Sequence, residues 1–416
     1  MKKFLILCFL GCMLTVCSLS QDILPGAWRT FVYVPLLKDK RVAVFANQTS
    51  MIGNIHLVDS LQKLGVNITK IFAPEHGFRG NADAGEKVKT YIDEQSGIKV
   101  ISLYGKKLKP SAEDLADVDV LLFDIQDVGV RFYTFISSLQ YFMEAAFENS
   151  KALMILDRPN PNGFYIDGPV LDTAYKSFIG MQPVPVVYGM TIGEYAFMIA
   201  GEQWLSSEAA NKKYEYYRNA NNSADTPFHF LVIKCANYTH ESKYALPVKP
   251  SPNLRDMQSV YWYPSTCFFE GTLISEGRGT EHPFCIFGDP ALPDNLYAFT
   301  PVANEGAKEP KFKDQLCYGW NVYTTNSKAL LSQLNEHLNI EYLLKAYALY
   351  PDKENFFIKP QSERDADYFF NKLAGNNILM QQIKEGKTAK QIYQSWKPAL
   401  EKFKKIRKKY LLYPDF

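Results

Sequence analysis

The feature that most constrains the fold is a series of short, mostly apolar runs separated by amphipathic stretches. In chain order these runs are "RVAVFAN", "VNITKIFAPEHG", "IKVISLYG", "VDVLLFDIQDVG", "KALMILDRPNPNG", "VPVVYGM" and "FHFLVIKCANY". Strands that are apolar along their whole length are buried on both faces, as in parallel sheets covered by helices. The sequence therefore predicts an α/β domain with a doubly wound parallel sheet over residues 25–246.

The alternation stops after the proline-rich segment "LPVKPSPNL" (246–254). Aromatic-rich extended segments such as "VYWYPSTCFFEGT" follow, and helical patterns such as "AKQIYQSWKPALEKFKKI" come last. Apolar residues make up 47% of the chain and aromatic residues 14%, which is enough for a second core. A smaller α+β domain is therefore predicted over residues 247–416.

The first twenty residues have the pattern of an export signal. Lys2 and Lys3 precede the apolar stretch "FLILCFLGCMLTVC", and small residues suited to cleavage stand before Gln21. The apolar stretch is short for a membrane span. Cleavage is the favoured interpretation, and the alternative is that "LTVC" is a lipobox with a lipid anchor on Cys17. Either way, the protein is expected to be exported and periplasmic or envelope-associated.

Charge and cysteine content exclude several classes of protein. Without Lys2 and Lys3 the chain has 44 basic residues against 44 acidic ones, so no overall attraction to nucleic acid is expected. Four cysteines outside the signal lie far apart without CxxC spacing: Cys235, Cys267, Cys285 and Cys317. This spacing argues against a zinc cluster and allows at most one or two disulfides.

Acidic residues recur where the predicted strands end. They are Glu75, Asp124, Asp127 and Asp157, with Arg79, Arg131 and Arg158 beside them. A single such acid is commonly a helix cap or a turn former, and Asp157 before "RPNPNG" is assigned that structural role. Open parallel sheets bind ligands at the carboxyl ends of their strands, so the group as a whole predicts a site at this edge.

Several motifs that would indicate other activities are missing from the sequence. The first strand is followed by "NQTSMIGN" rather than GxGxxG, and there is no P-loop, no GxSxG elbow and no HExxH. These absences argue against a dinucleotide enzyme, a serine hydrolase and a zinc protease. No cofactor and no metal site is predicted.

The densest polar stretch of the second domain is "FFEGTLISEGRGTEHPF" (268–284). Its charged residues include Glu270, Glu276, Arg278 and Glu281, interspersed with glycines that let a ligand approach the backbone closely. The alternative is a hairpin with solvated charges. Two carboxylates that face each other across an interdomain cleft are what glycosidic bond cleavage requires.

Five motifs together resemble the exo-β-N-acetylmuramidases, a family of glycoside hydrolases. They are "APEHGFRG", "DIQDVGVRFYTF", "LDRPNPNG", "PSPNL" and "FEGT…SEGRGT", and the similarity covers nearly all of the chain after the signal. The resemblance implies a Rossmann-like domain joined to a smaller auxiliary domain, with the active site in the cleft between them. It also implies release of N-acetylmuramic acid from the non-reducing end of peptidoglycan fragments.

The resemblance also carries over site residues, position by position. They are Glu75 and His76 in the first motif, Asp127 and Arg131 in the second, Asn160 in the third, and Glu270 and Arg278 in the last. Glu75 is the candidate proton donor, and His76 and Arg79 would orient it or bind sugar substituents. Its partner is left open between Glu270 and Asp127. Glu276 and Glu281 are given little weight.

The lactyl carboxylate of muramic acid calls for a cation in the pocket, and a guanidinium suits it best. Arg131 and Arg278 are the candidates, with Arg131 alternatively pairing with Asp127. Two rival functions remain at this point. A metal-dependent phosphoesterase could use Asp124, Asp127 and Asp157 around Mg²⁺, and a non-catalytic peptidoglycan-binding protein would show no turnover.

Overall fold

The structure is a computed structural model, and it describes residues 22–75, 77–80, 90–219, 228–362 and 364–416. Its largest element is a seven-stranded sheet of order β5-β6-β4-β1-β7-β8-β9. The strands are β1 (Arg41–Ala46), β4 (Asn67–Ala73), β5 (Tyr91–Ile92), β6 (Lys99–Ser102), β7 (Val120–Asp124), β8 (Ala152–Leu156) and β9 (Phe230–Ile233). All neighbouring pairs are parallel except β5 with β6. The predicted parallel sheet is therefore confirmed.

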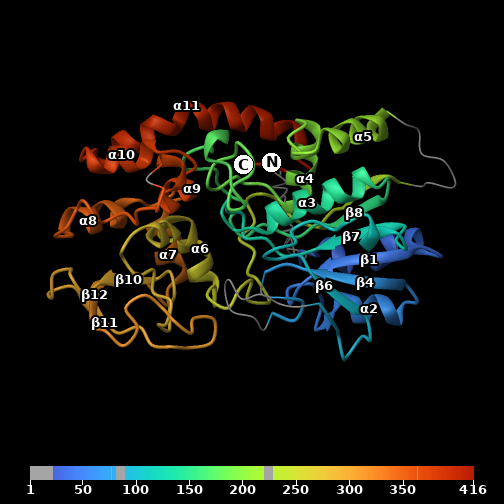
Figure 1. Cartoon of the computed structure of the whole chain (residues 1–416), viewed down its shortest axis with the longest axis horizontal. Coiled ribbons are helices and arrows are strands. Elements are labelled where there is room, and N and C mark those ends of the chain that lie inside the picture. The colour runs from blue at the N-terminus through green and yellow to red at the C-terminus, as the bar shows by residue number, and fades with distance from the viewer. Residues whose placement is uncertain (1–21, 76, 81–89, 220–227, 363) are drawn as a thin grey trace, which may run out of the picture.

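The sheet is buried because helices cover both of its faces. Figure 1 shows α3 (Phe135–Glu148), α4 (Ile192–Gly201) and α5 (Glu208–Asn219) on one side and α2 (Leu57–Lys63) on the other. All five residues of β7 are buried, as the continuous apolar run requires. A short α1 (Thr30–Tyr33) and a hairpin of β2 (Met51–Ile52) and β3 (Ile55–His56) complete this part of the chain.

The strand order fixes where a ligand can bind. From the central strand β1 the chain first builds β4 and β6 on one side, and then β7, β8 and β9 on the other. In open α/β sheets of this kind, ligands bind beyond the carboxyl ends of the strands, near the point where the direction of winding changes. The loops after β4, β6 and β7 meet at that edge.

The C-terminal region is smaller and combines helices with a three-stranded antiparallel sheet of order β10-β12-β11. The strands are β10 (Ile286–Asp289), β11 (Tyr297–Phe299) and β12 (Cys317–Asn321). The helices are α6 (Met257–Thr266), α7 (Ser327–Leu334), α8 (Glu341–Leu349), α9 (Phe369–Ala374), α10 (Ile378–Lys384) and α11 (Ala389–Arg407). This arrangement confirms the α+β prediction.

The last helix and the residues after it return to the first domain. Helix α11 runs along the top of Figure 1 from the C-terminal region toward α4. Arg407 at its end donates to the carbonyl of Gly189 at 2.8 Å, and the Tyr413 hydroxyl donates to Asp157 at 2.5 Å. The C-terminal segment therefore holds the two domains together.

The cysteines and the helices bear on two of the sequence-based expectations. Cys235, Cys267, Cys285 and Cys317 are buried free thiols, so none of the disulfides that the sequence allowed among them is formed. Within the described ranges, no helix is both long enough and apolar enough to cross a membrane. The predicted signal lies outside the described residues.

Candidate active site

A cavity of about 340 Å³ lies at the carboxyl edge of the large sheet, between the two domains. Glu75, two residues past the end of β4, lines it from the first domain, and Glu270 lines it from the second. Arg278 also lines it, so two predicted carboxylates and one predicted cation face the same space. The structure thus brings Glu75 together with two residues that lie 195 or more positions later in the chain.

Glu75 is held at the cavity by a tight turn after β4. Gly77 has φ +76°, and its N–H donates to the carbonyl of Pro74 at 3.1 Å. A left-handed φ of this kind favours glycine. Burial raises the pKa of Tyr104, and the negative charge of Glu75 and a hydrogen bond to it act in the same direction. Glu75 is itself partly buried and lies beside this neutral phenol. His76, the other predicted residue of this motif, lies outside the described residues.

Glu270 and Arg278 form an ion pair at the opposite wall. Glu270 lies in the short 3-10 helix Cys267–Gly271, and its Oε1 is 2.5 Å from Nη2 of Arg278. Both side chains are partly exposed, at 21% and 24%. Burial raises the pKa of Glu270, and the charge of Arg278 opposes that shift. A carboxyl with a raised pKa is a stronger base, which suits proton transfer at the site.

Glu276, a residue given little weight from the sequence, holds the other edge of Arg278. Its Oε1 lies 3.0 Å from Nε of Arg278, and Lys311 lies 3.3 Å from its Oε2. Burial opposes ionisation of Glu276, but Lys311 and Arg278 more than offset it and lower its pKa. The sequence offered one signal for this role, the acid two positions before the arginine in "EGRG".

The two glycines beside Arg278 serve a different purpose from the one expected. Gly277 and Gly279 have φ of +84° and +83°. A Cβ on Gly277 would lie 1.9 Å from the carbonyl oxygen of Ile286, and one on Gly279 would lie 2.7 Å from Val302 and Pro310. These glycines let the loop pack against its own domain, so they do not face the ligand.

Aromatic rings complete the cavity wall. Tyr263 packs edge-on against Phe284 at 4.9 Å and against Phe132 at 5.4 Å, and Tyr133 lies beside them. Ser251 and Asn253 of the "PSPNL" motif also line the cavity. A mainly aromatic pocket with a few converging polar groups is typical of a small-molecule site. None of these residues was among the predicted site residues, although two of the motifs contain Phe132, Tyr133, Ser251 and Asn253.

Asp127 does not line this cavity. It is 5% exposed, and its Oδ2 accepts hydrogen bonds from the Tyr188 hydroxyl and from the Gly129 N–H at 2.6 Å. Burial raises its pKa to about 6, against the opposing effect of those hydrogen bonds. Asp127 therefore holds the loop after β7, and of the two partners left open for Glu75 only Glu270 faces it across the cavity.

Arg131 does not contact the cavity either. Its side chain is fully buried and donates to the carbonyls of Pro169, Val184 and Leu373 at 2.7–2.8 Å. Burial lowers its pKa to about 9. Arg131 was predicted to read a substrate carboxylate or to pair with Asp127, but the structure places its Nη1 and Nη2 on three backbone carbonyls and away from the cavity lining. Arg131 instead links the first domain to α9.

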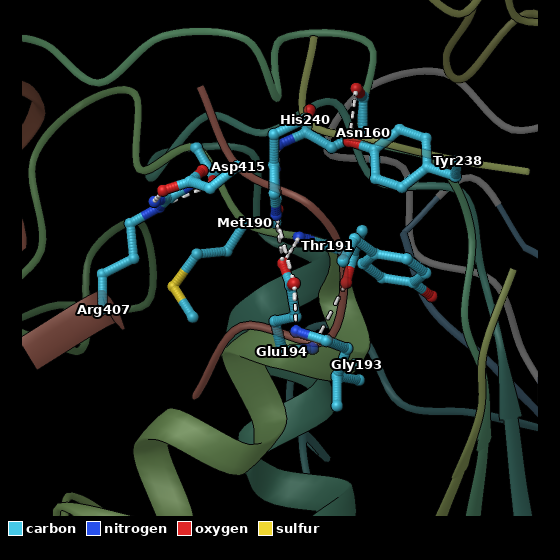
Figure 2. A network of polar contacts seen from close by, with 12 residues as sticks. Asn160, Met190, Thr191, Gly193, Glu194, Tyr238, His240, Arg407 and Asp415 are labelled. Atoms are coloured by element: carbon cyan, nitrogen blue, oxygen red, sulfur yellow. Dashed lines mark hydrogen bonds and ion pairs between the residues drawn. The ribbon is translucent and has the colours of Figure 1, made fainter. Parts of the chain in front are cut away.

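Asn160, in the loop after β8, belongs to a buried polar network (Figure 2). Its Nδ2 donates to the carbonyl of Met190 at 2.8 Å, and its Oδ1 accepts the N–H of Asn162. The same network joins Glu194 to His240 at 3.1 Å. Asn160 is buried and is not among the residues that line the cavity, so the structure does not bring it to the predicted site. Its hydrogen bonds shape the "RPNPNG" turn.

Arg79 is engaged by two carboxylates. It forms two hydrogen bonds with Asp93, at 2.8 and 3.1 Å, and lies 3.6 Å from Asp59. Its guanidinium also stacks on the ring of Phe78 at 4.4 Å. Arg79 is thus tied to the residue after β5 and to α2, and the structure does not place it in the cavity lining.

The acids proposed for a metal site do not converge. Asp124 forms a buried two-point ion pair with Arg158 at 2.6 and 2.8 Å. Asp157 accepts from Thr191 and from the N–H of Gly193 at the start of α4, which confirms its structural role. Among the described residues, no group of three or more His, Cys, Asp or Glu side chains has the arrangement of a metal site. The geometry gives the phosphoesterase alternative no support.

A second, larger cavity lies elsewhere in the molecule. It has a volume of about 570 Å³ and lies between α10, α11 and the segment around residues 169–172. Trp204, Trp396 and Phe403 make it largely apolar, and none of the predicted site residues lines it. The smaller cavity is therefore the candidate active site, because the charged motif residues meet there.

The family model described as exo-beta-N-acetylmuramidase NamZ matches the chain in two parts. Its N-terminal part matches residues 42–258 and its C-terminal part residues 261–413. The domain boundary predicted at residues 246–247 stays a prediction. The peptidoglycan beta-N-acetylmuramidase NamZ of Bacillus subtilis (strain 168) is 36% identical over 403 residues, which cover 92% of this chain and 89% of that protein.

Two crystal structures of DUF1343 family proteins from Bacteroides fragilis have the same architecture. One superimposes with a TM-score of 0.81 at 41% identity and covers 95% of this chain and 100% of its own. The other has a TM-score of 0.74 at 27% identity, with 94% and 99% covered. Both domains therefore fall within the shared fold.

Proposed function

Because the chain belongs to the exo-beta-N-acetylmuramidase NamZ family, we propose that it is an exo-acting glycoside hydrolase. Its proposed reaction releases N-acetylmuramic acid from the non-reducing end of peptidoglycan fragments. The observation that carries this proposal is the cavity in which Glu75 and Glu270 face each other from two domains. Glycosidases usually have two catalytic carboxyl groups on opposite sides of the bound sugar.

Glu75 is the proposed proton donor. It protonates the glycosidic oxygen as the bond to the leaving group breaks, and the Tyr104 hydroxyl, its hydrogen-bonding partner, holds it in place. Glu270 is the proposed second carboxylate, which attacks the sugar carbon or activates water on the opposite face of the ring. Burial raises the pKa of Glu270 and so strengthens it as a base.

Arg278 is proposed to bind the lactyl carboxylate that distinguishes muramic acid from N-acetylglucosamine. Of Arg79, Arg131 and Arg278, the arginines among the predicted site residues, Arg278 alone lines the cavity. A guanidinium binds a carboxylate with charge-assisted hydrogen bonds. The aromatic wall formed by Phe132, Tyr133 and Tyr263 provides an apolar surface for the sugar ring.

The direct test is hydrolysis of a chromogenic muramic acid glycoside by the purified protein. We expect turnover by the wild type, and we expect EDTA to leave the rate unchanged. Binding of muramic acid glycans without turnover would indicate the non-catalytic alternative. Loss of activity with EDTA that added Mg²⁺ restores would instead favour metal-assisted hydrolysis.

Export is a separate proposal, supported by the basic start and apolar stretch of residues 1–20. We propose that the protein acts in the periplasm or at the cell envelope, where its glycan substrate is found. Mass spectrometry of the protein recovered from the envelope would test this proposal. A chain that still begins at Met1 would contradict export, and a lipid on Cys17 would identify an anchored form.

A further inference from the structure

Glu276 is buried behind the cavity wall and contacts both of the cations nearest to Glu270. It is 3% exposed, and it is not among the residues that line the cavity with Glu75 and Glu270. One carboxylate oxygen lies 3.0 Å from Nε of Arg278, and the other lies 3.3 Å from Nζ of Lys311. A buried carboxylate is retained at such a position only when it is paired.

Lys311 is itself fixed by the backbone. Its Nζ donates to the carbonyls of Phe269, Thr272 and Ile274 at 3.0–3.1 Å, which surround the loop that begins with Glu270. The N–H of Phe284 donates to the carbonyl of Glu276 at 2.8 Å and closes the other end of this loop. Glu276 therefore has little freedom to move, and it presents a fixed negative charge to Arg278.

Arg278 is shared between two carboxylates as a result. Its Nη2 contacts Glu270, and its Nε contacts Glu276. We propose that Glu276 is a positioning residue that holds one edge of the Arg278 guanidinium and so prevents this cation from fully neutralising Glu270. Glu270 then stays basic enough to serve as the second carboxylate of the reaction. This inference rests on the proposed function, because it assigns a purpose to Glu270 in that reaction.

The electrostatics of the group agree with this arrangement. The charged and titratable groups around Glu270 are Arg278, Glu276, Lys311, Tyr263 and Cys267, and Glu75 faces it across the cavity. Burial raises the pKa of Glu270, Arg278 lowers it and Glu276 raises it. The pKa of Glu276 is shifted the opposite way, because Lys311 and Arg278 outweigh its burial. The ionised form is thus favoured at Glu276, while Glu270 remains the easier of the two to protonate.

The test compares Glu276→Gln with Asp289→Asn in otherwise unchanged protein. Asp289 is a matched control because it is equally buried, at 2% exposure, and lies near Lys311 without contacting Arg278. In Glu276→Gln, Arg278 pairs with Glu270 alone and lowers the pKa of that carboxyl. We expect the acid limb of the kcat–pH profile to move to lower pH by about one unit and the plateau kcat to fall by about tenfold.

Asp289→Asn should leave the limb unmoved, and Glu276→Asp should restore it because the charge is kept. A purely structural role for Glu276 would lower the thermal stability and the active fraction without moving the limb. That result, or equal profiles for Glu276→Gln and Asp289→Asn, would overturn the proposal.

A second measurement does not depend on turnover. The Glu270 carboxyl can be followed by ¹³C NMR in protein labelled at glutamate side chains, with its signal assigned by its absence in Glu270→Gln. We expect it to titrate at higher pH in the wild type than in Glu276→Gln. If the wild type fails to hydrolyse muramic acid glycosides while this difference is present, the proposed function fails and the electrostatic inference stands. An unchanged titration refutes the inference even if the enzyme is active.

Discussion

Glu75 and Asp127 each follow a strand of the large sheet, yet their surroundings differ in almost every respect. Glu75 is partly exposed and lines the cavity between the domains. Asp127 is buried, accepts from Tyr188 and Gly129, and has a pKa raised to about 6 by burial. A carboxyl that meets solvent and substrate can exchange protons during a reaction, whereas a buried one mainly holds its own loop. Position at the sheet edge is therefore not sufficient for catalysis.

Arg278 and Arg131 differ in the same way. Arg278 faces the cavity and is paired with acidic side chains, while Arg131 is fully buried and donates to three backbone carbonyls. The two pairs of residues provide matched experiments. Substitution of the cavity-facing member should change activity, and substitution of the buried member should change stability.

The largest effect is expected from Glu75→Gln. Glutamine keeps the shape of the side chain but has no proton to donate, so turnover of a muramic acid glycoside should fall by about 10²–10⁴-fold. The melting temperature should stay close to that of the wild type, because Glu75 is not part of the core. Hydrolysis rates and thermal unfolding of the same preparation check both statements. A variant with nearly normal turnover would remove Glu75 from its assigned role.

Arg131→Met should act on stability instead. The change leaves the carbonyls of Pro169, Val184 and Leu373 without their charged donor in a buried place. We expect the free energy of unfolding to fall by about 3–5 kcal/mol, as measured by urea denaturation. The folded fraction should retain most of its kcat. Unchanged stability together with a specific loss of turnover would show that Arg131 belongs with the active site after all.

Asp127→Asn tests the buried carboxyl through pH. The pKa of this group is about 6 in the folded protein, against about 4 in an unfolded chain. Between these values the folded state binds more protons, so the stability contributed by Asp127 falls as the pH rises through this window. The loss amounts to about 3 kcal/mol and is complete above pH 6.

Because asparagine does not titrate, the unfolding free energy of the wild type relative to Asp127→Asn should fall between pH 4 and pH 7. Urea denaturation at both pH values measures this difference. A constant difference would show that Asp127 has an ordinary pKa. If Asp127→Asn lost as much turnover as Glu75→Gln, Asp127 would be needed for catalysis and the distinction between the two carboxyls would be wrong.

Much of the fold could be predicted from local patterns. The run that became β7 is apolar at every position except its last, and all five of its residues are buried in a parallel sheet. The edge where the acids gather followed from the topology of such sheets. The position of the C-terminal segment was harder to predict from the sequence. Its attachment to the first domain depends on contacts such as that of Tyr413 with Asp157, 256 positions away.

Predicting which polar residues face the cavity was beyond local patterns. Asp127 turns inward because its carboxylate accepts the hydroxyl of Tyr188, 61 positions later. The donors of Arg131 are bound by carbonyls as far away as Leu373. Glu276 is held in place by an ion pair with Lys311, a residue that none of the motifs includes. The motifs identify the polar residues of the family, and long-range packing decides which of them contact a ligand.

The smallest effect, and the most specific one, is expected from Arg278→Ala. This change should lower kcat/KM on both muramic acid and N-acetylglucosamine glycosides, because Arg278 also pairs with Glu270. If Arg278 binds the lactyl carboxylate, the loss on the muramic acid substrate should be larger by about ten- to a hundredfold, as for one charge-assisted hydrogen bond of about 1.5–3 kcal/mol.

Arg131→Met, assayed on the same two substrates, is the control. Its selectivity ratio should equal that of the wild type, because the Arg131 guanidinium donates to backbone carbonyls and does not line the cavity. Arg278→Lys keeps a positive charge without the planar fork, so its selectivity should lie between those of the wild type and Arg278→Ala. An unchanged ratio in Arg278→Ala would mean that Arg278 serves only to hold Glu270, and that another group recognises the lactyl carboxylate.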